Sequence, residues 1–213
     1  MATWVTAPRQ RISGVREHPC VAPNMIRDQL KSSLSPTSSK ASFMYQNSRQ
    51  EYPNPGLRIK DVGIVGLPLS SDGVDTLKRA SHRAPFGKGT ETVVDENVRK
   101  TWQINAAEIS FVNTRWDEWV QKRVMPMALD TLAILPTSRE HLRAELYKLL
   151  LYEQDAHFKP HQDSEKVPNM FATLAICLPT EHEGGELILE HAGKRQVWNS
   201  ANTSAVDLSF AAW

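Results

Sequence analysis

The chain has 213 residues, of which 40% are hydrophobic and 23% charged, so it is long enough to bury its own core. No apolar run approaches the roughly 18 residues of a membrane-spanning helix, and no apolar secretory segment begins the chain, so neither class of protein is expected. Residues 1–60 hold nine Lys and Arg against three Asp and Glu, whereas residues 61–213 hold sixteen against twenty-one. This mildly acidic body lacks the basic face of a nucleic-acid-binding domain.

The first 52 residues are predicted to form a disordered, basic, serine-rich tail, and residues 53–213 the folded domain. Residues 31–42 are polar and rich in serine, without a helical or strand period. Such a segment buries too little apolar surface to offset the entropy lost on ordering. Its Arg and Ser content also loosely fits a mitochondrial presequence. An intracellular location is therefore expected, either cytoplasmic or nuclear, with the mitochondrion as the alternative.

Short strands and one helix are predicted for the first part of this domain. Three segments have strand-like composition: residues 57–65, 90–94 and 99–104. A helix is expected from about Ser70 to Arg83, because Ser70 or Ser71 can cap it and Asp72 would lie in its first turn.

The longest helix is predicted to begin at Thr114, where Thr114-Arg-Trp-Asp117 fits the capping-box pattern. Apolar side chains then recur every three or four residues and form one stripe: Trp116, Trp119, Val120, Val124, Met127 and Leu132. An aromatic stripe at this spacing is more often core than binding surface. Pro126 lacks a backbone N–H, so a kink or break is expected there.

After another capping signal at residues 137–140, the sequence is strand-like to its end. Five strands are expected between turns rich in Gly, Asn and Ser: residues 142–152, 170–178, 186–190, 195–198 and 205–213. Helices followed by a strand-rich half predict an α+β fold. The closely spaced hairpins favour an antiparallel meander folded into a barrel or a double-sheet jelly roll.

Metal-competent side chains are concentrated in residues 152–166. Within this segment, His161 and Asp163 stand two residues apart, and in extended backbone such residues share a face. One nitrogen and one oxygen ligand suit a divalent metal such as iron, and they form two thirds of a 2-His-1-carboxylate triad. A solvated surface turn would show the same tripeptide. The apolar strands on both sides favour a site at the mouth of the predicted barrel.

Several motifs occur together and in a fixed order along the chain. They are Tyr152 followed by Phe158, His161 and Asp163; then Cys177-Leu-Pro and Glu183-Gly-Gly-Glu-Leu187; and, further upstream, residues 55–60, 84–89, 98–102 and 143–153. This combination resembles the Fe(II)/2-oxoglutarate-dependent dioxygenases of the prolyl 4-hydroxylase type, and in particular a largely fungal group of that superfamily. The resemblance covers residues 53–213.

The resemblance implies a double-stranded β-helix (jelly-roll) core with N-terminal helices. It also implies Fe²⁺ bound by His161 and Asp163, the cosubstrate 2-oxoglutarate in contact with Tyr152, and prolyl 4-hydroxylase-like hydroxylation of an unknown substrate, such as a protein. For Tyr152, a core tyrosine in a buried strand is the alternative. Asp155 stands where many members have glycine, and Asp tolerates a left-handed turn. No nucleic-acid or membrane partner is expected.

The chain departs from the family pattern at its end. The family has a second histidine, and then a basic residue that binds 2-oxoglutarate, after a strand that residues 205–213 resemble. Neither stands in the expected place, so the domain is predicted to be incomplete at its C-terminus, with its last strands missing. His182 and His191 lie nearer to Asp163 than the pattern requires, and a peripheral role is expected for His157.

Two other interpretations remain open. The chain could be a non-catalytic fragment or a metal-binding remnant of this fold, because two protein ligands hold iron weakly. A cupin-like barrel that binds a small ligand without oxygen chemistry would need His157 to join His161 as a ligand. Cys20 and Cys177 are far apart and outside any CxxC motif, so neither a disulfide framework nor a cysteine zinc site is expected.

Overall fold

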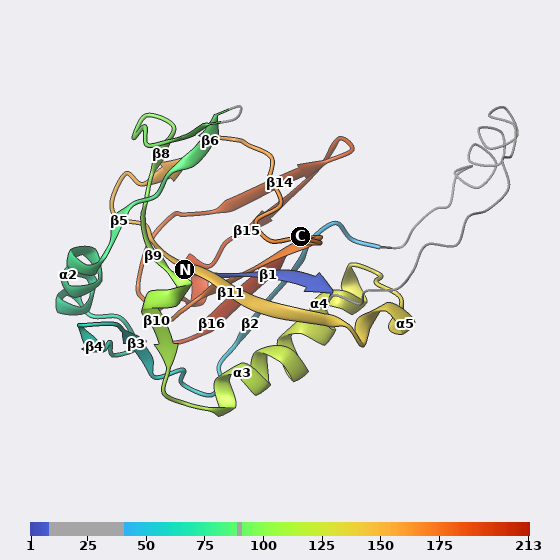
Figure 1. Ribbon diagram of the computed structural model, residues 1–213, viewed down its shortest axis with the longest axis horizontal. Coiled ribbons are helices and arrows are strands. Elements are labelled where there is room, and N and C mark those ends of the chain that lie inside the picture. The colour runs from blue at the N-terminus through green and yellow to red at the C-terminus, as the bar shows by residue number, and fades with distance from the viewer. Residues whose placement is uncertain (9–40, 89–90) are drawn as a thin grey trace, which may run out of the picture.

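The computed structural model describes residues 1–8, 41–88 and 91–213, mostly as strands with a few short helices (Figure 1). The predicted α+β class is therefore confirmed. The largest sheet has two free edges in the described part of the chain and does not close into a barrel. No helix among the described residues is long and apolar enough to cross a membrane.

Seven antiparallel strands form the large sheet. In spatial order they are β2 (Tyr45–Arg49), β16 (Leu208–Ala212), β13 (Ala172–Cys177), β1 (Ala2–Pro8), β11 (Leu142–Leu151), β9 (Trp102–Asn105) and β5 (His82–Arg83). Smaller sheets surround it: β3 (Leu57–Ile59) with β4 (Gly63–Ile64) and β10 (Ile109–Phe111), β8 (Arg99–Lys100) with β12 (His157–Phe158), β14 (Leu187–His191) with β15 (Lys194–Trp198), and β6 (Phe86–Lys88) with β7 (Glu91–Val93). The five strands expected after residue 141 are thus all present: β11, β13 and β16 are shorter than predicted, β14 is shifted by one residue, and β15 begins one residue earlier.

Strand β1 corrects the predicted domain boundary. Residues 2–8 pair with β11 on one side and with β13 on the other, near the middle of the large sheet. Residues 45–49 pair with β16, so both described ends of the predicted tail belong to the fold. The reason is pairing: residues 2–8 gain stability from two neighbouring strands, which no local sequence pattern reveals. Residues 9–40, which include most of the serine-rich stretch, lie outside the described residues.

Met1 is hydrogen-bonded to Leu150 of β11. The Leu150 N–H donates to the Met1 carbonyl at 2.5 Å, and the Met1 ammonium donates to the Leu150 carbonyl. Burial of this ammonium lowers its pKa below the usual value for a chain terminus. Residue 1 therefore takes part in the hydrogen bonding of the large sheet.

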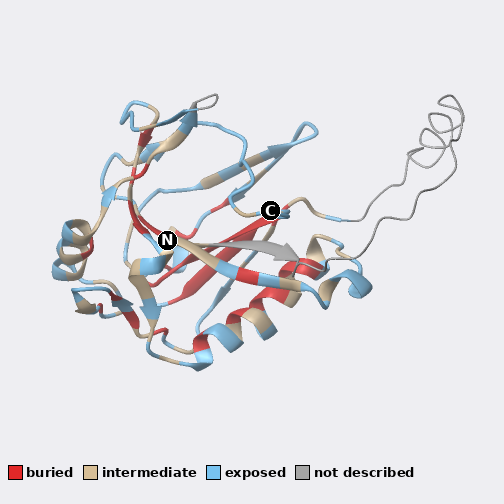
Figure 2. Ribbon diagram, viewed as in Figure 1, coloured by how far each residue is buried: buried red, intermediate tan, exposed pale blue. Residues whose placement is uncertain are grey.

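The two faces of the large sheet are covered differently. On one face, alternate residues of β13 and β16, among them Leu174, Ile176 and Phe210, belong to one core cluster with residues of the long helical segment, and the Phe210 ring packs edge-on against Trp119. On the other face, Ala175, Cys177 and Ala211 pack against Trp198 of the β14–β15 hairpin. Figure 1 shows the helices and the hairpin on opposite sides of the sheet, and Figure 2 shows the buried strands between them.

The long helical segment contains a π-helical turn where the sequence predicts a kink. It consists of α3 (Arg115–Trp119), a π-helical turn (Val120–Val124) and α4 (Met125–Thr131). The Met125 N–H donates to the Val120 carbonyl, five residues back, just before Pro126, which has no N–H to donate. The wider turn lets the chain pass the proline without a break. A short α5 (Pro136–Arg139) follows it.

Helix α2 (Ser71–Ala80) begins as its sequence predicts and ends three residues earlier. The Ser70 side chain caps it by accepting a hydrogen bond from the Gly73 N–H at 3.2 Å. Asp72 lies in its first turn, where a negative charge is favourable.

A β-bulge in β11 changes which residues face the core. Thr3 pairs with Lys148 and Trp4 with Leu146, so Tyr147 is the extra residue. Before the bulge Leu142, Ala144 and Leu146 face the helical core; after it Leu149 and Leu151 do. Tyr147 and Lys148 therefore both lie on the opposite, hairpin-side face, as expected of a bulge that redirects side chains.

The central position of β1 predicts a large effect of proline within it. Val5 pairs with Glu145 of β11 and with Thr173 of β13. Val5→Pro removes a backbone N–H between two paired strands, and we expect the free energy of unfolding in urea to fall by at least about 2 kcal/mol. Val94→Pro is the control, because Val94 is 57% exposed and lies outside the strands. Equal unfolding midpoints for the two variants would contradict the placement of β1.

Candidate functional site

His161 and Asp163 lie together on the hairpin side of the large sheet. The His161 Nε2 atom is 3.7 Å from the Asp163 Oδ1 atom, a distance too long for a hydrogen bond. The His161 Nδ1 atom is 2.9 Å from the Lys159 carbonyl oxygen, which can only accept. Nδ1 therefore donates in this contact, and Nε2 is the ring nitrogen that faces Asp163. A histidine that binds a metal is commonly oriented in this way.

The other oxygen of Asp163 is held from two directions. The Thr173 hydroxyl donates to Oδ2 at 3.2 Å, and the Trp213 indole N–H donates to it at 3.0 Å. The neighbouring His161 imidazole, with the donors from Trp213 and Thr173, holds the pKa of Asp163 below its usual range against the opposing effect of burial. Asp163 is thus kept ionised, with Oδ1 facing the histidine.

The His161 ring is part of a stack that includes a buried cation. Its centroid lies 3.6 Å from the centroid of Phe158, with the rings 23° apart. The Arg99 guanidinium carbon lies 4.4 Å from the Phe158 centroid, and an Arg99 Nη donates to the Pro85 carbonyl at 2.9 Å. The pairing of β8 with β12 brings Arg99 opposite Phe158. The stack fixes the imidazole plane by packing.

Tyr152 lies on the same face of the large sheet as Asp163. The whole residue is 39% exposed, yet its hydroxyl end is surrounded by protein, next to Arg99 and Thr101. No hydrogen bond of normal geometry reaches the Thr101 hydroxyl. Burial raises the pKa of the Tyr152 phenol, and the Arg99 charge opposes this shift. Tyr152 is thus neither a fully buried core residue nor a free surface residue.

Lys148 brings a second cation to this face through the β-bulge. Its Nζ donates to Gln103 Oε1 at 3.0 Å and lies 4.3 Å from the Tyr147 ring centroid. Burial, together with the positive charges of Arg99 and Lys166, lowers the pKa of Lys148 to about 8. Asp163 acts in the opposite direction and raises it.

The two cations have no carboxylate partner. Arg99 is only 8% exposed, and its Nε has no hydrogen-bond acceptor. Among the ion pairs of the described residues, none includes Arg99 or Lys148. Buried charges are normally paired, because desolvation is costly otherwise. This face is therefore suited to an anion.

A third protein ligand is not brought to His161 and Asp163. Within the described ranges, no group of three His, Cys, Asp or Glu side chains could hold a metal. His157 is turned to the carbonyls of Asp155 and Asn97, at 3.3 Å each. His191 packs against the Phe43 ring at 5.7 Å between centroids. Asp155 takes φ 60°, so the expected left-handed turn before the site is confirmed.

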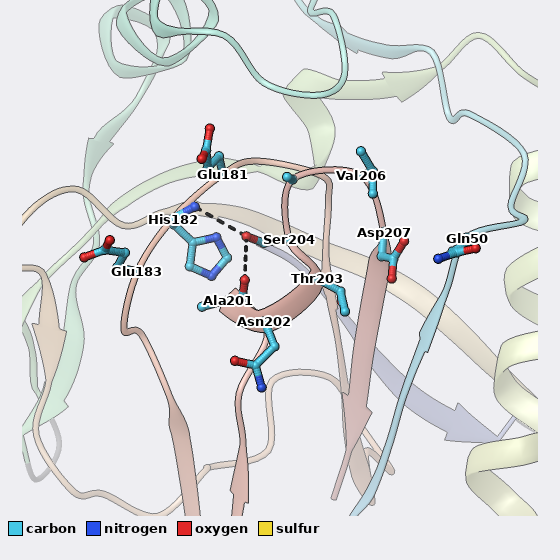
Figure 3. A pocket seen from close by; sticks show the side chains of 11 residues that line it. Gln50, Glu181, His182, Glu183, Ala201, Asn202, Thr203, Ser204, Val206 and Asp207 are labelled. Carbon is cyan, nitrogen blue, oxygen red and sulfur yellow. Dashed lines mark hydrogen bonds between the residues drawn. The ribbon is translucent and has the colours of Figure 1, made fainter.

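His182, the remaining candidate ligand, lies in a separate pocket (Figure 3). Its Nδ1 contacts the Thr180 carbonyl at 2.8 Å and its Nε2 the Ser200 hydroxyl at 3.1 Å, so both ring nitrogens are engaged. The pocket has a volume of about 400 Å³ and lies between the 180–184 loop and the start of β16. This histidine belongs to that pocket and not to the His161 site.

Comparison of the chain with protein-family models, with curated proteins and with solved structures finds no match.

The sequence analysis identified His161 and Asp163 as candidate metal ligands but missed the nearby cations Arg99 and Lys148. His161 and Asp163 are two residues apart, so their proximity follows from local geometry. Arg99 and Lys148 come from other strands, and the bulge at Tyr147 reverses the alternation that would have placed Lys148. One sequence signal was available: polar residues alternate at Arg99, Thr101 and Gln103, as on one face of a strand. All three side chains are buried in the structure.

The lowered pKa of Lys148 predicts how stability depends on pH. At low pH both the folded and the unfolded chain carry the proton, and the folded state bears the cost of a buried ammonium. As pH rises through about 8, Lys148 of the folded state loses its proton, and the cost of burying its charge disappears. The unfolded state keeps this proton until about 10.5, so the free energy of unfolding rises between these two pH values. Over this pH range we expect the free energy of unfolding of wild type to increase by about 1–2 kcal/mol relative to that of Lys148→Met. A fully buried lysine would give a larger increase, because solvent would not screen its charge.

Urea unfolding of both proteins from pH 7 to pH 10.5 measures this difference. Lys194→Met, at the exposed tip of the β14–β15 hairpin, is the matched control and should show no such trend. A stability difference for Lys148→Met that stays constant with pH would refute the assignment.

Proposed function

We propose that the chain is an Fe(II)/2-oxoglutarate-dependent oxygenase domain of the prolyl 4-hydroxylase type that supplies two of the three usual protein ligands. In this proposal the large sheet and the β14–β15 hairpin are the two sides of a double-stranded β-helix. The reaction would be a prolyl 4-hydroxylase-like hydroxylation of a substrate such as a protein.

The arrangement of His161 and Asp163 is the observation that carries the proposal. Their inner atoms, Nε2 and Oδ1, face each other at 3.7 Å, while their outer atoms are held by Lys159, Thr173 and Trp213. An imidazole and a carboxylate oriented by outer hydrogen bonds fit two adjacent positions around a divalent metal. Exposed fractions of 41% and 34% leave both side chains accessible.

The unpaired cations support 2-oxoglutarate as the cosubstrate. This dicarboxylate needs a basic partner for the carboxylate farthest from its oxo group, and the basic residue usual in the resembled family does not stand at its expected place. Here Arg99 and Lys148 are both within electrostatic range of Asp163 and carry no ion pair. We propose that they hold this carboxylate, with the Tyr152 hydroxyl as a further donor.

A bound iron would supply the oxygen-activating, oxidising chemistry of this class. The chain's own residues have simpler roles. His161 and Asp163 hold the ion, Trp213 and Thr173 keep the carboxylate oriented, and Phe158 fixes the imidazole plane. The ionised state of Asp163 leaves Oδ1 free to bind without first losing a proton.

The lack of a third ligand among the described residues favours a second candidate function. A metal-binding domain without turnover would need only His161 and Asp163, which agrees with the lack of a group of three metal-competent side chains among the described residues. The two functions differ in one product: only the oxygenase converts 2-oxoglutarate to succinate and carbon dioxide.

Metal binding is expected to depend on both donors. We expect Mn²⁺, used as a stable substitute for Fe²⁺, to bind wild type weakly and to bind His161→Ala and Asp163→Ala at least about tenfold more weakly, a change of about 1.4 kcal/mol. The measurement is titration calorimetry together with Mn²⁺ electron paramagnetic resonance. His157→Ala is the matched control, because this exposed histidine contacts only backbone carbonyls.

Three outcomes are distinguished when Fe²⁺, 2-oxoglutarate and oxygen are then added. Succinate formed by wild type and lost in His161→Ala supports the oxygenase. Metal binding without succinate supports the metal-binding domain. Equal Mn²⁺ affinity for wild type and both donor variants rejects the site itself.

A further inference from the structure

We propose that His82 is a positioning residue for the anion site at Arg99 and Lys148: acting through the Gln103 side chain, it keeps Lys148 in the charged form that binds an anion. Strand β9 lies between β5 and β11 in the large sheet (Figure 1), so His82, Gln103 and Lys148 come from three adjacent strands. The anion is 2-oxoglutarate in the proposed function, and in that respect this inference rests on it. The link between His82 and Lys148 does not itself depend on metal or oxygen chemistry.

Hydrogen bonds join the three side chains in a row. The Lys148 Nζ donates to Gln103 Oε1 at 3.0 Å, and Gln103 Nε2 is 3.0 Å from His82 Nε2. The strand register places them: His82 pairs with Gln103, and Lys148 pairs with Asn105, two residues from Gln103 on the same face. Gln103 is only 5% exposed, whereas His82 is exposed on the edge strand β5. The row therefore leads from the surface of the molecule to the partly buried amine.

Donors and acceptors along this row can be assigned, because a lysine ammonium can only donate. Gln103 Oε1 accepts from Lys148, so the amide NH₂ of Gln103 faces His82 and donates to it. The His82 Nε2 atom is then an acceptor, which means an imidazole nitrogen without a proton. The same NH₂ has a second acceptor in Asn105 Oδ1, at the longer distance of 3.4 Å.

The opposite orientation of the Gln103 amide would favour a neutral Lys148. With the amide turned over, its NH₂ would face Lys148, and only an uncharged amine could accept from it. Burial lowers the pKa of Lys148 to about 8, so the neutral amine is accessible near physiological pH. An acceptor at His82 Nε2 stabilises the observed orientation of the amide and therefore the charged form of Lys148.

The other groups around Lys148 act on its charge in both directions. Burial and the positive charges of Arg99 and Lys166 oppose the charged form, whereas Asp163 favours it. The Tyr147 ring also favours a cation, since its centroid lies 4.3 Å from Nζ. A metal ion bound to Asp163 would offset the charge of that carboxylate. In a metal-loaded site, the ammonium would therefore depend more strongly on its hydrogen bond within the row.

The test measures the protonation of Lys148 directly, without metal or cosubstrate. The pKa is obtained by NMR from the ¹³Cε resonances of labelled lysine, and the resonance that is absent from Lys148→Met identifies the residue. His82→Phe keeps a ring at this exposed position but removes the acceptor, and we expect it to lower the pKa of Lys148 by about 0.5. Gln103→Leu removes the acceptor of the ammonium itself and should lower this pKa at least as much.

Two further variants show whether the effect belongs to the acceptor at position 82. His82→Gln supplies an amide oxygen and should keep the pKa of Lys148 near its wild-type value. His141→Phe, at another exposed histidine, is the matched control and should leave it unchanged. A pKa of Lys148 that is the same in His82→Phe and in wild type would overturn the inference, even if Gln103→Leu lowers it.

Binding of 2-oxoglutarate to the Mn²⁺-loaded protein then relates the row to the proposed function. At about pH 8.5 we expect His82→Phe to bind 2-oxoglutarate at least about twofold more weakly than wild type, with unchanged Mn²⁺ affinity, because less of its Lys148 is charged. A lowered pKa of Lys148 with unchanged 2-oxoglutarate affinity would overturn the positioning role. If wild type does not bind 2-oxoglutarate, the proposed function fails, whereas the pKa of Lys148 in His82→Phe still decides whether His82 acts on it.

Discussion

The pairing of β1 on both of its edges is the constraint on which the rest of the structure depends. On one side it contacts β11, which carries Lys148 and leads into Tyr152; on the other it contacts β13, which carries Thr173. In the large sheet these two groups of strands are joined only through β1. Asp163 is anchored by Thr173 of β13, whereas Lys148 belongs to β11, so the geometry of the proposed site depends on the first eight residues of the chain.

The bulge opposite β1 has a chemical consequence as well as a structural one. A regular strand would direct Tyr147 and Lys148 to opposite faces, and one of them would enter the helical core. The extra residue sends both to the hairpin side, where Arg99 and Asp163 also lie. The helical face can then remain apolar around Trp116 and Phe210, while the polar groups gather on the other face. A change of register at one position thus keeps the polar side chains of β11 out of the helical core.

Two regions of opposite charge leave buried polar atoms without partners. Arg99 Nε lies on the cationic face beside His161, and Asp207 Oδ1 lies directly before β16. Native proteins satisfy most such atoms, because each orphan costs free energy that the fold does not recover. Both atoms are closed off from solvent, so the rest of the fold bears this cost.

The sequence by itself determined what depends on neighbours along the chain. The cap at Ser70, the disturbance before Pro126, the five C-terminal strands and the closeness of His161 to Asp163 follow from periods of two or 3.6 residues and from local turn chemistry. Only the tertiary structure decided that residues 2–8 form a central strand rather than part of a tail. It also decided that Lys148 joins Arg99, and that Asp207 lines a pocket with the acids of a distant loop. These outcomes depend on pairing between segments far apart in sequence, which no local pattern encodes.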